Sequence, residues 1–333
     1  MESDTLARRS EVALAKLTAR IRARAYGTAA RALLRLTLPS LDFRGLLGDH
    51  RAAQKLHEDI LSRPGMRQVL RRLELQDLLS LPLFAATLPL DVLRAYRKQR
   101  HRISRLDVVA ADDFPYPDYY LNDFHHQANG NLSLRAALTY EWQIRFLFHG
   151  ANRLMRQAVV DALPEGSHLE VLDVGCGTAA WIAQARLQRR GHWVTGVDLS
   201  PPYLRVARLL NGRTTTFLQA NAEQLSQDWA ERFDVVTCIW LFHELPVAAA
   251  ERVMAEIARV LKPGGRLIFL DALQEAPDPQ TTMDGAQFAE HFNEPYFEDY
   301  QRLDLAALTQ RHGLRVDATE RWYVSKLLTA TKP

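Results

Sequence analysis

From residue 169 onward, short apolar runs alternate with stretches of helical periodicity, and this alternation limits the possible folds more than any other feature. The apolar runs are LEVLDVG, HWVTGVD, TTFLQA, FDVVTCI and GGRLIFLDA, with helical patterns near 179–189, 201–210 and 247–261. Strands that alternate with helices form a parallel sheet with right-handed crossovers. A helix at about 299–312 and two closing strands, LRVDATE and WYVSKLLTAT joined by a tight turn, complete the pattern. We therefore predict an α/β fold.

The first half of the chain has a different texture. Helices are expected over 5–36 with a break near Gly27, over 50–62, 65–78 and 90–101, and over 132–163 with an interruption at Gly150 and Ser133 as N-cap. Between them, residues 110–131 form a loop rich in Pro, Asp, Asn and aromatic residues. We predict an all-helical N-terminal cap domain over 1–132, which includes this loop. A catalytic domain over 133–333 would follow, with 133–163 as its connecting helix.

Composition excludes several classes of protein. Of the 333 residues, 47% are apolar and 24% are charged, as is usual for soluble globular proteins. No run of eighteen apolar residues occurs that could span a membrane. The two cysteines, Cys176 and Cys238, are too few for a disulfide framework or a cysteine-rich metal site. The arginine-rich start lacks the pattern of a secretory signal, so we expect a cytoplasmic protein.

The charge is distributed unevenly along the chain. Residues 1–105 carry 21 Lys and Arg against 10 Asp and Glu, and the remainder carries 21 against 29. One interpretation is a basic surface for nucleic acid, and the other is a basic helical layer that docks on an acidic domain of the same chain. We favour the second, because the basic residues are scattered through amphipathic helices with few aromatic residues between them. Nucleic acid is therefore not an expected partner.

One motif points to chemistry. The sequence VLDVGCGTA at 171–179 follows a strand and opens a helix, and Gly175 and Gly177 allow the backbone to turn tightly and approach a ligand. Asp198 ends the second strand, where a carboxylate can bind both hydroxyls of a ribose. A dinucleotide-binding domain is the main alternative, but it would have a glycine near Ala180 for close packing over a pyrophosphate.

Three further features follow in order: Asn221, Ala222 and Glu223 after the third strand, RFDVVTCIWLFHEL as the fourth strand with its loop, and RVLKPGGRLIFLDA as a helix, a glycine turn and the fifth strand. With these features, residues 165–331 resemble the class I S-adenosylmethionine (SAM)-dependent methyltransferases. The resemblance is strongest to their small-molecule, ubiquinone-methyltransferase-like branch. It implies a Rossmann-like, seven-stranded, mostly parallel sheet whose last two strands are antiparallel, and SAM as the cofactor.

The resemblance also implies roles for individual residues. Asp173 and the backbone of Gly175 and Gly177 would hold the amino-acid end of SAM, and Asp198 would hold the ribose. Leu199 would lie against the adenine, and Asn221, where the family usually has Asp, beside its amine. The remaining residues expected to line the cofactor pocket are Cys176, Ala222, Trp240 and His243.

Methyl transfer needs an aligned acceptor, exclusion of water and sometimes removal of a proton. The candidate catalytic residues are His243, Tyr140, His125, His126 and Tyr120. The histidines could instead make structural hydrogen bonds, and the tyrosines could simply pack inside the cap domain. Glu244, which follows His243, could cap the N-terminus of the next helix. No HxxxH or HExxH spacing occurs, so we expect no metal. A second aromatic cluster, HFNEPYFEDY at 291–300, is expected over the acceptor site.

These features together predict a methyltransferase that acts on a small-molecule acceptor of specialised metabolism, enclosed under a helical lid, in a monomer or homodimer. Two other interpretations stay open. The first is a SAM-consuming cyclase that forms azetidine-2-carboxylate and methylthioadenosine by intramolecular displacement. The second is a SAM- or nucleic-acid-binding module without enzymatic activity.

Overall fold

A computed structural model describes residues 50–78, 82–87 and 112–333, with gaps at 128, 190, 213–214, 275–288 and 290–291, and a few single residues between 90 and 110. The helix expected at 5–36, the break at Gly27 and most of the helix expected at 90–101 lie outside the described residues. None of the described helices is long and apolar enough to cross a membrane.

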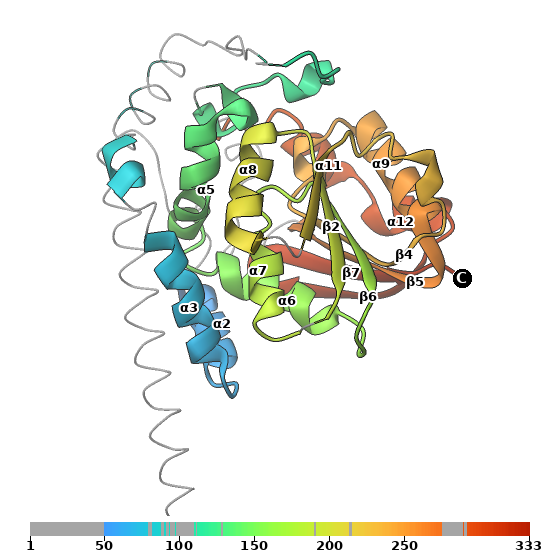
Figure 1. The fold of residues 1–333 in the computed structure, drawn as a ribbon, viewed down its shortest axis with the longest axis horizontal. Coiled ribbons are helices and arrows are strands. Elements are labelled where there is room, and N and C mark those ends of the chain that lie inside the picture. Colours follow the sequence, from blue (N-terminus) through green and yellow to red (C-terminus); the bar gives the residue numbers. More distant parts are fainter. Residues whose placement is uncertain are drawn as a thin grey trace, which may run out of the picture.

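Seven strands form one sheet in the order β3-β2-β1-β4-β5-β7-β6 (Figure 1). Their bounds are β1 Glu170–Val174, β2 Trp193–Asp198, β3 Thr215–Gln219, β4 Phe233–Ile239, β5 Leu261–Ala272, β6 Arg315–Trp322 and β7 Ser325–Thr331. The first five strands pair in parallel, and β7 pairs antiparallel with both β5 and β6. The predicted α/β class and the antiparallel closing pair are confirmed.

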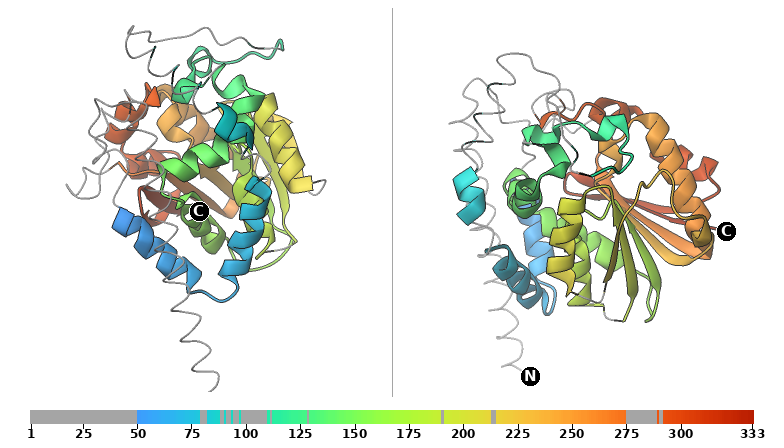
Figure 2. Two further views of the ribbon diagram at one scale, coloured as in Figure 1. Left: turned by 90° about the vertical axis from the view of Figure 1, so that its left-hand side faces the viewer. Right: turned by 45° about the horizontal axis from the view of Figure 1, so that its top comes forward.

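Helices cover both faces of the sheet (Figures 1 and 2). On one face lie α6 (Asn152–Ala162), α7 (Ala180–Arg186) and α8 (Pro201–Asn211), and on the other lie α9 (Val247–Val260) and α12 (Leu305–Arg311). Neighbouring strand residues belong to opposite layers: Val235 packs with the first set of helices and Val236 with the second. Strands buried on both faces are apolar at nearly every position, which explains the continuous apolar runs of the sequence.

The helix boundaries refine the expectations. The predicted long helix is two helices, α5 (Leu134–Leu147) and α6, separated at Gly150, whose φ of +78° ends the first one. Ser133 Oγ accepts a hydrogen bond from the Ala136 N–H at 3.3 Å, as expected of an N-cap. The single helix expected at 299–312 is instead α11 (Phe297–Arg302) followed by α12, because Asp304 caps α12 through the Ala307 N–H.

The closing strands also differ slightly from the expectation. Their tight turn lies at Tyr323 and Val324, later than the expected junction before Trp322. Tyr323 has a φ of +60°, which makes the sharp reversal, and its hydroxyl lies 3.0 Å from His149 Nδ1.

Two helices of the predicted cap, α2 (His50–Leu61) and α3 (Met66–Leu78), form an outer layer beside α6 and α7 (Figure 1). Ile60 and Leu70 pack with Leu154 of α6, and Arg153 donates to the Leu73 carbonyl at 3.2 Å. No residue of these two helices lines the cavity described below. The domain boundary at residue 132 stays a prediction.

Gly196 lies on β2, between β1 and β3, and provides a test of how closely the side chains pack there. A Cβ atom at this position would lie 2.8 Å from the Phe217 ring and 3.0 Å from Cys176 Sγ. We expect Gly196→Ala to lower the free energy of unfolding by about 1–3 kcal/mol through overpacking, measured by urea denaturation. In a Phe217→Leu background the loss should shrink, and equal losses in both backgrounds would contradict this explanation.

Candidate functional site

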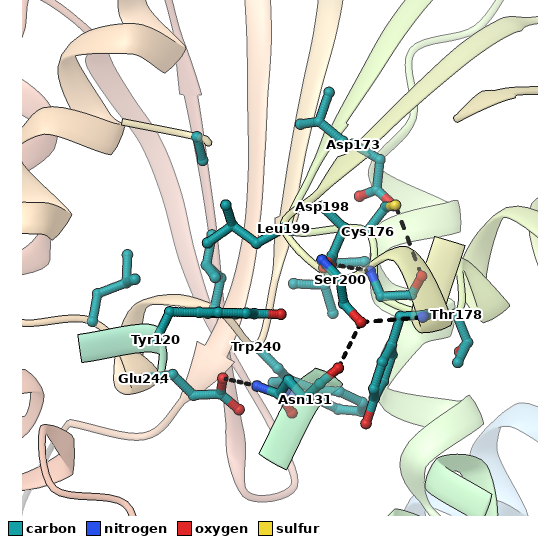
Figure 3. Close-up of a pocket in the computed structure, with 18 of the residues that line it drawn as sticks. Tyr120, Asn131, Asp173, Cys176, Thr178, Asp198, Leu199, Ser200, Trp240 and Glu244 are labelled. Atoms are coloured by element: carbon teal, nitrogen blue, oxygen red, sulfur yellow. Dashed lines mark hydrogen bonds between the residues drawn. The ribbon is translucent and has the colours of Figure 1, made fainter. Parts of the chain in front are cut away.

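A cavity lies at the carboxyl ends of the central strands, where β1 is flanked by β2 on one side and β4 on the other (Figure 3). It encloses about 1060 Å³, including its opening to solvent. Open α/β sheets bind their ligands at this place, because the connections from neighbouring strands leave in opposite directions there.

The glycine turn after β1 forms one wall of the cavity. Gly175 and Gly177 have φ values of +67° and +51°, which side chains disfavour. A Cβ atom on Gly175 would lie 3.0 Å from Leu241 Cδ2, so the turn packs closely against the loop after β4. Cys176 donates its N–H to the Val197 carbonyl at 2.9 Å, and its side chain lines the cavity. The backbone can therefore approach a ligand directly.

Asp198 lies at the end of β2, beside this turn (Figure 3). Its Oδ2 accepts a hydrogen bond from the Gly177 N–H, and its Oδ1 accepts one from the Ser200 N–H, both at 2.8 Å. Burial raises the pKa of Asp198, and these N–H groups oppose the shift because they favour the charged form. Each oxygen retains a lone pair for a ligand hydroxyl.

Asp173, at the same edge of β1, has an unsatisfied oxygen. Its Oδ1 accepts from the Thr237 hydroxyl at 2.7 Å, whereas Oδ2 is buried and has no hydrogen-bond partner among the described residues. Burial raises the pKa of Asp173 to about 7, although the Thr237 hydroxyl and the nearby Trp181 indole N–H act in the opposite direction. The indole N–H does not reach hydrogen-bond geometry. A buried carboxylate oxygen of this kind requires a donor, and a ligand ammonium group would supply one.

Arg156 lines the cavity from α6 and was not among the predicted site residues. Its guanidinium donates two hydrogen bonds to Glu141 at 2.8 and 2.9 Å and lies 4.8 Å above the Trp240 ring. A guanidinium fixed in this way can bind a carboxylate. Together with Asp173 it makes the site suitable for the two charges of an amino acid. Within an apolar helical pattern no sequence signal distinguished this arginine from a surface one.

The far end of the cavity is lined by Leu199, Asn221 and Ala222, as predicted. Asn221 Oδ1 accepts from the Glu223 N–H at 2.9 Å, so one of its lone pairs serves its own loop. The Tyr119 hydroxyl donates to Glu223 at 2.7 Å and attaches the aromatic loop to this end. Trp240 contributes a wall after β4 and has a φ of +52°.

Tyr120 and Tyr140, two of the candidate catalytic residues, also line the cavity. Tyr120 stacks on Tyr116 with 5.8 Å between ring centroids, and Tyr140 meets Tyr203 edge to face at 5.7 Å. Burial raises the pKa of both Tyr120 and Tyr140, so both phenols are protonated at neutral pH. They can donate hydrogen bonds and present π faces.

Of the three candidate histidines, two have described side chains, His243 and His125. Neither is among the residues that line the cavity. His243 Nδ1 is 2.5 Å from Asp271 Oδ1, and His125 Nε2 is 3.0 Å from Glu294 Oε1. Burial opposes their charge, but the carboxylates prevail: the pKa of His243 is raised to about 10, and that of His125 is also raised. With a pKa of about 10, His243 is protonated near neutral pH, and a protonated imidazole is a poor base. The side chain of His126 lies outside the described part of the chain.

Three further observations bear on the candidates. Glu244 does not cap α9, whose N-cap is Pro246 without a side-chain hydrogen bond. Its carboxylate lines the cavity instead. Burial raises the pKa of Cys176 and Cys238, so neither thiol is an activated nucleophile. Among the described residues no group of three or more His, Cys, Asp or Glu is arranged to hold a metal ion.

Residues 172–269 match a family described as "Methyltransferase domain". The ubiquinone biosynthesis O-methyltransferase of Pseudomonas paraeruginosa is 37% identical over 110 residues, which cover 32% of this chain and 45% of that protein. The protein of the same name from Xanthomonas axonopodis pv. citri is 30% identical over 177 residues, which cover 51% of this chain and 72% of the relative. The chain thus spans about half the length of the Pseudomonas relative and most of the Xanthomonas one.

Solved structures of similar proteins include a SAM-dependent methyltransferase from Aquifex aeolicus, with 17% identity and a TM-score of 0.42 over 54% of this chain and 93% of that one. Another from Mesorhizobium loti has 18% identity and a TM-score of 0.43 over 53% of this chain and 97% of that one.

The raised pKa of Asp173 predicts a pH-dependent affinity for SAM. Below about pH 7 the free protein has a protonated Asp173, which must lose its proton to pair with the SAM ammonium group. We expect the Kd for SAM, measured by calorimetry, to rise about tenfold per pH unit below that value. Asp173→Asn should bind weakly with no such slope, and a slope that persists in this variant would contradict the assignment.

The His243–Asp271 pair predicts a pH dependence of stability. His243 has a folded-state pKa of about 10, above the unfolded value of about 6.5, so its contribution is complete below pH 6.5 and is lost as the pH rises toward 10. Over this range the free energy of unfolding should fall by up to about 1.4 kcal/mol per pH unit. Denaturant titrations of His243→Gln should show a shallower decline, and parallel curves would disprove the coupling.

Proposed function

The chain belongs to the class I SAM-dependent methyltransferases, and from this premise we propose that it transfers the SAM methyl group to a small-molecule acceptor. The observation that carries the proposal is the pair of carboxylates at the ends of neighbouring strands, Asp173 on β1 and Asp198 on β2, which line one cavity. One matches an ammonium group and the other a ribose, and SAM carries both.

The residues of the cavity fit the parts of SAM in order. Asp173 would bind the amino group and Arg156 the carboxylate, and Asp198 would bind the ribose hydroxyls. The adenine would lie among Leu199, Asn221 and Ala222, and the glycine turn with Cys176 would follow the chain between them. SAM supplies an electrophilic methyl group, and the rings of Tyr120, Tyr140 and Trp240 suit its sulfonium charge.

A lid supports the choice of a small acceptor. The segment 112–131 lines the cavity through Tyr119, Tyr120, Phe124 and Asn131, and α5 lines it through Tyr140. We call the segment 112–131 the aromatic lid. It is attached to the rest of the molecule through Tyr119 and Glu223, through Ser200 Oγ and the Asn131 carbonyl at 2.6 Å, and through Asn293 and the Asp123 carbonyl at 3.1 Å. A protein or nucleic-acid acceptor would need an open groove. Helices α2 and α3 are not part of this lid.

The finer predictions stay predictions: specialised metabolism, a cytoplasmic location, a monomeric or homodimeric state, and roles for His125, His126 and His243. The relatives are named as O-methyltransferases, so the comparisons do not favour the cyclase that would release methylthioadenosine.

The test is a mass-spectrometric assay of purified protein with SAM, without and with a metabolite extract. We expect S-adenosylhomocysteine to form only with the extract. Asp198→Asn should raise the Kd for SAM at least tenfold, because charge-assisted hydrogen bonds to the ribose are lost. Glu298→Gln, on the surface of α11, is the matched control. Methylthioadenosine formed without an acceptor, or no SAM binding, would overturn the proposal.

A further inference from the structure

One carboxylate of the cavity is left without a role once SAM is assigned. Glu244 follows β4 in a single helical turn, η6 (Phe242–Glu244), and its side chain is 19% exposed. Its Oε2 accepts a hydrogen bond from Asn131 Nδ2 at a long 3.4 Å, beside Tyr120 (Figure 3). Its Oε1 is 3.7 Å from His125 Nε2, too far for a hydrogen bond. The carboxylate is therefore weakly held and faces the cavity.

Behind Glu244, acidic and basic side chains alternate in a row that leads to the sheet. His125 Nε2 is 3.0 Å from Glu294 Oε1, Glu294 Oε2 is 3.8 Å from His243 Nε2, and His243 Nδ1 is 2.5 Å from Asp271. Each imidazole lies closer to another carboxylate than to Glu244. The carboxylates of the row favour the charged form of both imidazoles, and the row leaves the oxygens of Glu244 available to a ligand.

The position of Glu244 adjusts its proton affinity. Burial raises the pKa of Glu244. The neighbouring His125 and His243 lower this pKa, whereas Glu294 and Asp198 raise it, and the net change is an increase. Tyr120, Tyr140 and Tyr203 face it as well and are protonated, because their pKa values are raised. A carboxylate with an elevated pKa is a better proton acceptor near neutral pH than an ordinary one.

The other ionisable side chains of the cavity are excluded one by one. Asp173, Asp198 and Arg156 are occupied by SAM in the proposed function. The tyrosines and Cys176 are protonated, as their raised pKa values require. Among the described residues that line the cavity, this leaves Glu244.

We propose that Glu244 is the general base of the reaction and that the acceptor group is a hydroxyl, because a neutral hydroxyl is a weaker nucleophile than a thiolate or a free amine and depends most on a base to remove its proton. The inference rests on the proposed function. In the step, the acceptor oxygen forms a bond to the methyl carbon while the methyl–sulfur bond breaks. The electron pair of that bond goes to sulfur, which yields S-adenosylhomocysteine, and the hydroxyl proton passes to a Glu244 oxygen.

His125 and Asn131 are positioning residues in this arrangement. His125 has a φ of +56°, a backbone conformation that costs energy for a residue with a side chain. Its hydrogen bond to Glu294 fixes the ring beside Glu244, and in its charged form this ring favours the ionised carboxylate of Glu244. Asn131 holds Glu244 from the lid, so lid closure and placement of the base are connected.

The experiment uses wild type, Glu244→Gln, Glu244→Asp and the surface control Glu298→Gln, with SAM and a panel of simple phenols, aliphatic alcohols, amines and thiols. With a hydroxyl acceptor, Glu244→Gln should lower kcat at least about 100-fold, while the Kd for SAM changes less than about twofold. Glu244→Asp should recover part of the rate. With 4-nitrophenol at about pH 8, an acceptor that is already largely ionised, the loss should be much smaller.

Two readouts separate this inference from the proposed function. The first is formation of SAM from S-adenosylhomocysteine and methyl iodide, which needs methyl-transfer geometry but no base. If wild type binds no SAM, or releases methylthioadenosine without an acceptor, the proposed function fails. If Glu244→Gln retains the methyl iodide reaction and loses hydroxyl methylation, the inference holds. The second is a carbon NMR titration of isotope-labelled glutamates, in which the resonance absent from Glu244→Gln should titrate above the ordinary glutamate pKa of about 4.3.

Three results would overturn the inference. One is methylation of amines or thiols by wild type with no hydroxyl of the panel accepted. Another is an unchanged rate with hydroxyl acceptors in Glu244→Gln. The third is an equal loss of the methyl iodide reaction and of hydroxyl methylation, which would assign Glu244 to cofactor placement.

Discussion

The site depends on the carboxylate of Asp198, which joins two loops from different strands. One oxygen accepts the N–H of Gly177 in the turn after β1, and the other accepts the N–H of Ser200 at the start of α8. Because β1 and β2 are neighbours in register, this single side chain fixes the separation of the two loops at the sheet edge. Ser200 in turn donates to the Asn131 carbonyl, so the aromatic lid is placed by the same group of contacts.

A second constraint is the buried ion pair between α5 and α6. Glu141 and Arg156 are each less than one-tenth exposed, and the pair stacks on Trp240. Buried ion pairs contribute little net stability, since desolvation offsets their attraction. Here the pair holds the Arg156 guanidinium at the end of the cavity that the proposed function assigns to the amino-acid part of SAM. The contribution of the pair is therefore the orientation of this guanidinium. The pKa of Glu141 is lowered, because the three arginines 145, 153 and 156 outweigh its burial.

The sequence was sufficient for the sheet and for many of the residues that line the cavity. Alternation of apolar runs and helices is a local property, and the motif residues lie at strand ends, where topology alone brings Asp173, Asp198 and Trp240 together. It was insufficient for Arg156, Glu244 and Glu294. Their roles depend on which way a helix or loop faces in the folded molecule, and a helical pattern does not encode that. His243 was placed correctly along the chain, yet its ring is directed at Asp271 instead of the cavity.

The attachment of the aromatic lid has a kinetic consequence. Three separate contacts, at Glu223, Ser200 and Asn293, hold the lid over a cavity that must take up two substrates and release two products. Each exchange requires several hydrogen bonds to open together, which makes opening slow compared with diffusion. In the proposed function, opening of the lid would then limit how fast the ligands enter and leave the cavity.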